Sequence, residues 1–241
     1  MTQSKGPVAA VLDSLRGGQL KPTVILLSSA VLMLAWWHFG SPEFYGEHFA
    51  PYWTLWENAA ATAAVYSFVA SFLLLGAVPA LIVKLLLRER LADYGVGFGV
   101  PKYTIRSFLI LAPLFVLFGY TASLVPAVRE YYPINRQTDM PAGLFGFNTC
   151  MYVLFYLGWE FHFRGFLQFG LRDSMGPVNA VLVQVMASSL LHIGKPTSEA
   201  FASIAAGILW GILAFRTRSL LSGLLQHAIL GITLDWCICY M

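Results

Sequence analysis

Three ionisable side chains interrupt an apolar stretch in the segment GWEFHFRGFL, residues 158–167. Glu160, His162 and Arg164 follow one another at intervals of two residues. Within a membrane, ionisable groups cost about 2.5–3.5 kcal/mol each on insertion scales, so they usually serve a function. A carboxylate can act as a general base, and an arginine can fix its position and charge. This segment is therefore the first candidate for a catalytic site.

Helical spacing places these three residues on two different faces of the helix. Residues four apart share one face of an α-helix, so we expect Glu160 to pair with Arg164. At about 100° per residue, His162 lies about 200° around the helix from Glu160. We interpret His162 as a satisfied packing histidine. The Glu160–Arg164 pair either belongs to a site or only neutralises two charges within the helix packing.

Two later apolar segments carry further polar groups. His192 precedes the turn-rich sequence IGKPTSEA, and His227 opens HAILGITLD. Gly231 and Asp235 follow His227 at four and eight residues, on the same helical stripe. Helical rise places Glu160, His192 and Asp235 roughly 18–24 Å above one membrane face and His227 roughly 12 Å above it. Three separate segments therefore bring polar groups to one layer.

These residue types suit peptide hydrolysis. A carboxylate and an imidazole that share a water molecule can deprotonate it for attack on a carbonyl carbon. A second imidazole can donate to the oxyanion that forms, and this donation is worth more in a low dielectric than in water. Two histidines and a carboxylate also suit zinc. The sequence contains no HExxH motif, so we expect no cofactor and keep zinc as the alternative.

The elements that position these groups follow from composition. The chain is 58% hydrophobic and 11% charged, whereas a soluble domain has about 45–50% apolar and about 25% charged residues. We therefore predict an all-α, multi-pass integral membrane protein within the lipid bilayer. The net charge of +3, without a long basic run, argues against a nucleic-acid partner.

Seven segments approach the roughly 20 residues needed to cross the hydrocarbon core. They are residues 22–40, 59–87, 106–126, 143–171, 177–193, 200–215 and 219–238. Because the connecting segments are short, we expect one transmembrane domain over residues 22–241, with its core motifs in about 143–238. A cytoplasmic segment, residues 1–21, precedes it. Within that segment, PVAAVLDSLR is either a short helix on the membrane surface or a frayed tail.

The distribution of lysine and arginine predicts the orientation, because such residues favour cytoplasmic loops. Eleven lie on the side of the N-terminus: Lys5, Arg16, Lys21, Lys84, Arg88, Arg90, Lys102, Arg106, Arg172, Arg216 and Arg218. Three lie on the opposite side: Arg129, Arg136 and Lys195. We therefore expect a cytoplasmic N-terminus and a C-terminus outside.

Taken together, these motifs resemble those of a known family. WEFHFRGFL resembles the EExxxR motif, often followed by GxL, of the CPBP intramembrane proteases. This CAAX-processing and bacteriocin-self-immunity (ABI) family includes CAAX prenyl protease 2. The segment ending in His192, with Ser188 in the Phe position, resembles the family's FxxxH motif. HAILG, starting at His227, resembles its HxxxN motif, and the likeness extends over about residues 88–240.

The resemblance implies an intramembrane protease of the glutamic or CAAX type. In it, Glu160 and His192 would activate water, and His227 would stabilise the oxyanion. Arg164 would hold Glu160 or the helix in place. Trp159 stands where the family has its first Glu, so Glu160 is the carboxylate left in the motif.

A second departure from the family lies on the last span. Gly231 stands where the family has its oxyanion Asn. We expect Asp235, one turn further along the helix, to fill part of that space.

A narrower resemblance concerns the substrate. WExxxR, HxGKPxxE and HAxxG together resemble bacterial, myxosortase-like proteases linked to C-terminal sorting signals. The likeness implies a membrane-anchored protein substrate whose tail is one transmembrane helix with a basic end. It also implies a prokaryotic cytoplasmic (inner) membrane. Lys195 and Glu199 would then shape the outer mouth of the site.

Two other functions remain as alternatives. Trp159 and Gly231 are consistent with a catalytically inactive protein that binds or chaperones a transmembrane partner. The buried acid and histidines are also consistent with a proton-coupled transporter. Such transporters usually contain internal repeats, which this sequence lacks. The sequence predicts no particular oligomeric state.

Overall fold

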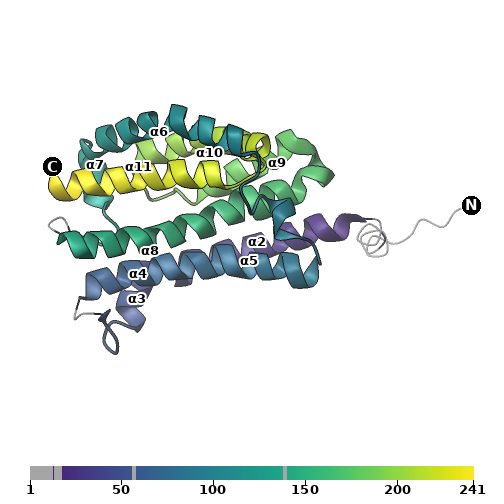
Figure 1. Ribbon diagram of the computed structural model, residues 1–241. Coiled ribbons are helices and arrows are strands. Elements are labelled where there is room, and N and C mark those ends of the chain that lie inside the picture. Colours follow the sequence, from purple (N-terminus) through teal and green to yellow (C-terminus); the bar gives the residue numbers. More distant parts are fainter. Residues whose placement is uncertain (1–12, 14–17, 56–57, 138–139) are drawn as a thin grey trace, which may run out of the picture.

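The computed structural model describes residues 13, 18–55, 58–137 and 140–241 (Figure 1). Apart from Asp13, the expected surface helix PVAAVLDSLR lies outside these residues, as does most of the predicted segment 1–21. Within the described part of the chain, all regular secondary structure is helical. The prediction of an all-α protein is therefore confirmed.

The helices follow the predicted spans in order. They are α2 (Leu20–Phe39), α3 (Pro42–His48), α4 (Ala59–Ser71), η3 (Phe72–Ala77), α5 (Val78–Leu81), η4 (Ile82–Leu86), η5 (Leu91–Tyr94), α6 (Pro101–Ser123), α7 (Pro126–Tyr131), α8 (Ala142–Glu160), η6 (Phe161–Phe169), α9 (Gly170–Leu190), α10 (Thr197–Thr217) and α11 (Leu221–Tyr240). η3, η4 and η6 are π-helical turns. Because η6 directly follows α8, Glu160 and Arg164 lie on one continuous helical rod.

Five helices are long and apolar enough to cross a membrane. They are α2, the continuous rod Ala59–Leu86, α6, α10 and α11. Large apolar side chains on these helices point outward, for example Leu27, Leu109 and Phe201, which are 66%, 65% and 72% exposed. Such a surface suits lipid rather than water. The chain is an integral membrane protein.

The two other predicted spans, 143–171 and 177–193, are helical but more polar. α8 packs between the α4–α5 rod and α11, as Figure 1 shows. α9 bends at Gly176, whose φ of +76° is left-handed and which directly precedes Pro177. The polar groups of these two helices are thus enclosed by the apolar ones.

Buried amides fix the packing of the polar helices. The Gln168 side chain donates to the Gly211 carbonyl at 2.8 Å, and Gln184 donates to the Gly207 carbonyl at 2.9 Å. Hydrogen bonds between membrane helices contribute about 0.6 kcal/mol on average, up to about 1.7. These two bonds hold η6 and α9 against α10, and so set the positions of the residues that η6, α9 and α10 carry.

Candidate active site

Glu160, Arg164 and His227 form a tight group, which we term the inner cluster. Glu160 Oε1 lies 3.3 Å from Arg164 Nη1 and 2.9 Å from His227 Nδ1. Glu160 and Arg164 are almost fully buried. The predicted pairing of Glu160 with Arg164 is confirmed, and α11 adds His227 to it.

Hydrogen bonding fixes the proton position on His227. An ionised carboxylate only accepts, so Nδ1 of His227 is the donor and Nε2 is the second, unbonded nitrogen. The Trp210 ring lies 4.5 Å from the imidazole ring, and the Arg164 guanidinium lies over the same indole at 5.4 Å. Glu160 Oε2 has no hydrogen-bond partner among the described residues. The inner cluster therefore retains one free carboxylate oxygen and one free imidazole nitrogen.

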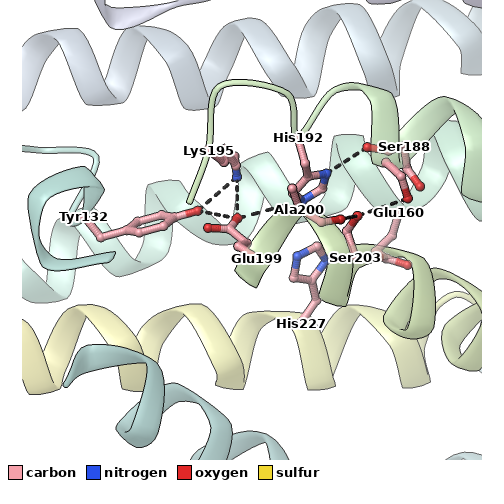
Figure 2. A network of polar contacts seen from close by, with 10 residues as sticks. Tyr132, Glu160, Ser188, His192, Lys195, Glu199, Ala200, Ser203 and His227 are labelled. Carbon is pink, nitrogen blue, oxygen red and sulfur yellow. Dashed lines mark hydrogen bonds and ion pairs between the residues drawn. The ribbon is translucent and has the colours of Figure 1, made fainter. Parts of the chain in front are cut away.

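Tyr132, His192, Lys195 and Glu199 form a second group, the outer cluster (Figure 2). His192 Nδ1 lies 2.8 Å from the Ser188 carbonyl oxygen, which accepts only, so Nδ1 carries the hydrogen. His192 Nε2 faces Glu199 Oε1 at 3.8 Å. Lys195 Nζ and the Tyr132 hydroxyl both donate to that same oxygen, at 2.9 and 2.8 Å.

Tyr132 donates a hydrogen bond to Glu199 in the outer cluster. It follows α7, outside the long apolar helices, and its side chain is buried. Burial, together with the negative charge of Glu199, holds the pKa of Tyr132 well above its usual value. The phenol is therefore neutral near pH 7 and donates to Glu199.

Trp159 lies between the two clusters. It directly precedes Glu160, and its ring meets the His192 ring edge-on, with centroids 5.7 Å apart. It also packs on Trp36, with centroids 5.5 Å apart. The indole thus packs beside His192. Position 159 contributes an apolar ring contact where the resembling family has a carboxylate.

Gly231 lies against a tyrosine hydroxyl. A Cβ atom at this position would stand 1.8 Å from Tyr156 Oη, an impossible contact. The Tyr156 ring lies 4.4 Å from the His227 ring. Tyr156, and not Asp235 as expected, fills the space in front of Gly231. Asp235 is buried nearby on α11, and its Oδ1 has no partner among the described residues.

Residues 141–233 match the family model described as Type II CAAX prenyl endopeptidase Rce1-like. This segment runs from the start of α8 into α11 and carries the inner cluster together with His192, Lys195 and Glu199. This match supports the resemblance of the chain to the CPBP family of CAAX-type proteases. No curated protein and no solved structure matches it.

Within the matched segment, Glu160 and His192 make their direct polar contacts with different partners. We expected Glu160 to share a water molecule with His192. Glu160 instead contacts His227, and the carboxylate within 4 Å of His192 is Glu199. Lys195 and Glu199, expected only at the outer mouth, thus directly adjoin a predicted catalytic histidine.

The donor set does not fit a zinc site. Among the described residues, no three His, Cys, Asp or Glu side chains converge as metal ligands would. Both histidines use Nδ1 for other hydrogen bonds, and Glu160 and His192 lie in different clusters. We therefore derive no step through a metal.

His162 packs away from both clusters, as predicted. It is fully buried, and the rings of Phe163 and Phe166 lie 5.1 and 6.0 Å from its own. Neither ring nitrogen has a hydrogen-bond partner among the described residues, so the expectation of a satisfied histidine is wrong.

A cavity of about 600 Å³ adjoins the outer cluster. Its walls include Trp36, Phe155 and Trp159, with Arg136 and Lys195 among its charged residues. Trp159 and Lys195 also contact members of the outer cluster. The cavity therefore places a space large enough for a substrate segment beside residues that contact His192.

Two tyrosines of the site escaped the sequence analysis. Tyr156 precedes Glu160 by four residues, so its place on the same helix face was open to prediction. Tyr132 is brought to Glu199 across 67 residues of chain. No local pattern reports that contact.

Proposed function

We propose that this protein is an intramembrane endopeptidase that hydrolyses a peptide bond with water activated by histidine and carboxylate groups. The observation that carries the proposal is the pair of imidazoles. Each has Nδ1 held by an acceptor, a free Nε2 and a carboxylate beside it. Both lie within the segment that matches the CAAX endopeptidase family.

In the proposed first step, His192 Nε2 takes a proton from water while the water oxygen attacks the scissile carbonyl carbon. A carbon–oxygen bond forms, and the carbonyl π electrons move to the oxygen. His192 is suited to this role because Ser188 fixes its tautomer and its ring packs against Trp159, which lines the cavity. General base catalysis of this kind contributes about 10²–10⁴-fold.

The oxyanion then needs donors. In the proposal, His227 is an imidazolium throughout the cycle, so that its Nε2–H donates to the oxyanion while Glu160 supports the charge through Nδ1. Tyr156, whose ring packs on His227, provides a hydroxyl donor in the space beside Gly231. A carboxylate paired with arginine is a poor base. The contact with Arg164 thus favours Glu160 as the residue that orients His227.

In the second step, the tetrahedral intermediate collapses and the carbon–nitrogen bond breaks. The departing amine takes the proton that His192 accepted from water, so the enzyme returns to its starting protonation state. New carboxyl and amino termini are the products.

The proposed substrate is a membrane-anchored protein. In the predicted orientation, the cavity-lining residues Glu43, Arg136 and Lys195 belong to the outer side. We propose a C-terminal sorting segment as substrate and a prokaryotic cytoplasmic membrane as location. The WExxxR and HxGKPxxE patterns support this finer assignment through their likeness to myxosortase-like proteases.

A cleavage assay tests the proposal. Purified protein in lipid nanodiscs is incubated with a peptide that carries one transmembrane segment and a basic end. We expect cleavage by the wild type and its loss in Glu160→Ala, His192→Ala and His227→Ala. Cleavage that survives in both Glu160→Ala and His192→Ala would overturn the assignment. Cleavage that stops in strong chelator and returns with zinc would favour the metal route.

An inactive binding protein is the second candidate, favoured by the indole at Trp159 and the absent side chain at Gly231. In that case, the alanine variants would leave the cellular phenotype intact. Filling the cavity, for example by Ile193→Trp at its wall, would abolish that phenotype.

A further inference from the structure

The outer cluster contains a carboxylate that the proposed mechanism has not used. We propose that Glu199 is a positioning residue: it favours the protonated form of His192 during hydrolysis, and Lys195 opposes it. The catalytic consequence rests on the proposed function, whereas the electrostatic coupling can be measured without it.

The geometry places Glu199 at the reactive nitrogen. Nδ1 of His192 is committed to the Ser188 carbonyl, so a proton from water can only arrive at Nε2. Glu199 Oε1 lies 3.8 Å from Nε2, too far for a hydrogen bond and close enough for a strong charge interaction. The negative charge thus faces the atom that becomes cationic.

The surroundings keep Glu199 ionised and in place. Lys195 Nζ and the Tyr132 hydroxyl donate to its Oε1, and Lys195 Nζ also lies 2.9 Å from the Tyr132 oxygen. Glu199 lies in the first turn of α10, where the helix dipole stabilises negative charge. Three independent contributions therefore favour the carboxylate over the neutral acid.

The elements packed around His192 differ in the charge of the side chain that they place near it. Burial disfavours an imidazolium at position 192 most strongly. Lys195 from its own loop and His227 from α11 disfavour it as well. α8 contributes the uncharged Trp159 ring. Within the described part of the chain, Glu199 from α10 is the carboxylate within 4 Å that favours the charge.

The proposal adds no new bond to the reaction. His192 Nε2 accepts a proton from water in the first step and returns it to the leaving amine in the second. Glu199 lowers the free energy of the intermediate state in which Nε2 carries that proton. Its carboxylate neither gains nor loses a proton.

The test compares two charge changes of opposite sign. The full chain in nanodiscs, labelled with ¹⁵N-histidine, is titrated by NMR. The chain has five histidines, and His192→Gln identifies the signal of His192. In Glu199→Gln, we expect the protonation midpoint of His192 to move at least about one unit lower, a tenfold change in proton affinity. In Lys195→Met, we expect it to move higher.

Two further variants separate charge from structure. Tyr132→Phe removes a hydrogen bond to Glu199 without changing charge, and we expect only a small shift. Glu199→Asp retains the charge, and we expect most of the wild-type midpoint to return. Equal midpoints in Glu199→Gln and the wild type, or shifts of the same sign in Glu199→Gln and Lys195→Met, would overturn the proposal.

Activity gives the second readout. The acid limb of the kcat profile should move in the same direction as the midpoint in each variant, with KM nearly unchanged. Opposite NMR shifts in a protein that cleaves nothing would refute the proposed function and leave the coupling standing. Normal cleavage with unchanged midpoints would refute the coupling alone.

Discussion

The inner and outer clusters contain the same chemical groups in different surroundings. Each has an imidazole, a carboxylate and a cationic side chain. In the inner cluster, Glu160 and Arg164 are each 2% exposed at the side chain. In the outer cluster, Lys195 and Glu199 are 19% and 26% exposed. The imidazoles themselves differ less, since the His227 and His192 side chains are 17% and 11% exposed. The difference in burial therefore lies in the charged pair that adjoins each imidazole.

The contacts within each cluster agree with that difference. Glu160 touches His227 directly at 2.9 Å, whereas Glu199 stands 3.8 Å from His192. A direct contact holds a charge in place, whereas at 3.8 Å the His192 Nε2 makes no hydrogen bond to Glu199 and keeps its lone pair available. We therefore place water activation in the outer cluster and oxyanion stabilisation in the inner one.

The largest expected effect comes from replacing His192, the proposed general base of the outer cluster. His192→Ala should lower kcat about 10²–10⁴-fold, because no other side chain of the described chain presents a free imidazole nitrogen beside Glu199. Initial rates of peptide cleavage in nanodiscs measure this. A loss below tenfold would place the base elsewhere.

Stability should distinguish the two ion pairs. Glu160→Gln leaves the Arg164 charge buried and should destabilise the fold by about 3–5 kcal/mol. Glu199→Gln breaks a partly exposed pair and should cost only about 0–1 kcal/mol. Unfolding followed in parallel on both variants checks this order. Equal losses of unfolding free energy in the two variants would contradict the idea that burial distinguishes the two ion pairs.

Tyr156 tests the oxyanion assignment of the inner cluster. Tyr156→Phe should lower kcat about 100-fold, because loss of one oxyanion donor typically costs that much. Gly231→Ala should have a comparable effect, since its Cβ would displace the Tyr156 hydroxyl. Gly146, on α8 with open space around it, offers the matched control as Gly146→Ala. Normal kcat in both test variants would assign the oxyanion to His227 alone.

The smallest expected effect concerns Tyr132. Tyr132→Phe removes one hydrogen bond to Glu199, worth about 1 kcal/mol, so kcat should fall less than tenfold. Because the pKa of Tyr132 is raised, its proton stays in place as pH increases, and the loss should be the same from pH 6 to 9. A loss that grows with pH would show that Tyr132 itself ionises during turnover.

Much of the fold was open to prediction from the sequence. The long apolar runs define the helices, and four-residue spacing pairs Glu160 with Arg164. Both rest on interactions local to a helix. The positions of His192 and His227 within one region also followed, because helical rise converts sequence distance into depth.

The partners of the histidines were not open to prediction. Depth alone does not say which carboxylate faces His192, because that depends on how α10 is rotated against α8. The turn at residues 191–196 brings Lys195 and Glu199 together, and α7 brings Tyr132 from elsewhere in the chain. The filling of the Gly231 space by Tyr156 likewise depends on the close approach of α8 to α11.

The most direct test of intramembrane proteolysis is mass spectrometry of a transmembrane peptide incubated with the purified protein in H₂¹⁸O and chelator. We predict two fragments, with ¹⁸O in the new carboxyl terminus, from the wild type. We predict an intact peptide from His192→Ala and His227→Ala. An intact peptide with the wild type, or identical fragments from all three proteins, would contradict the account.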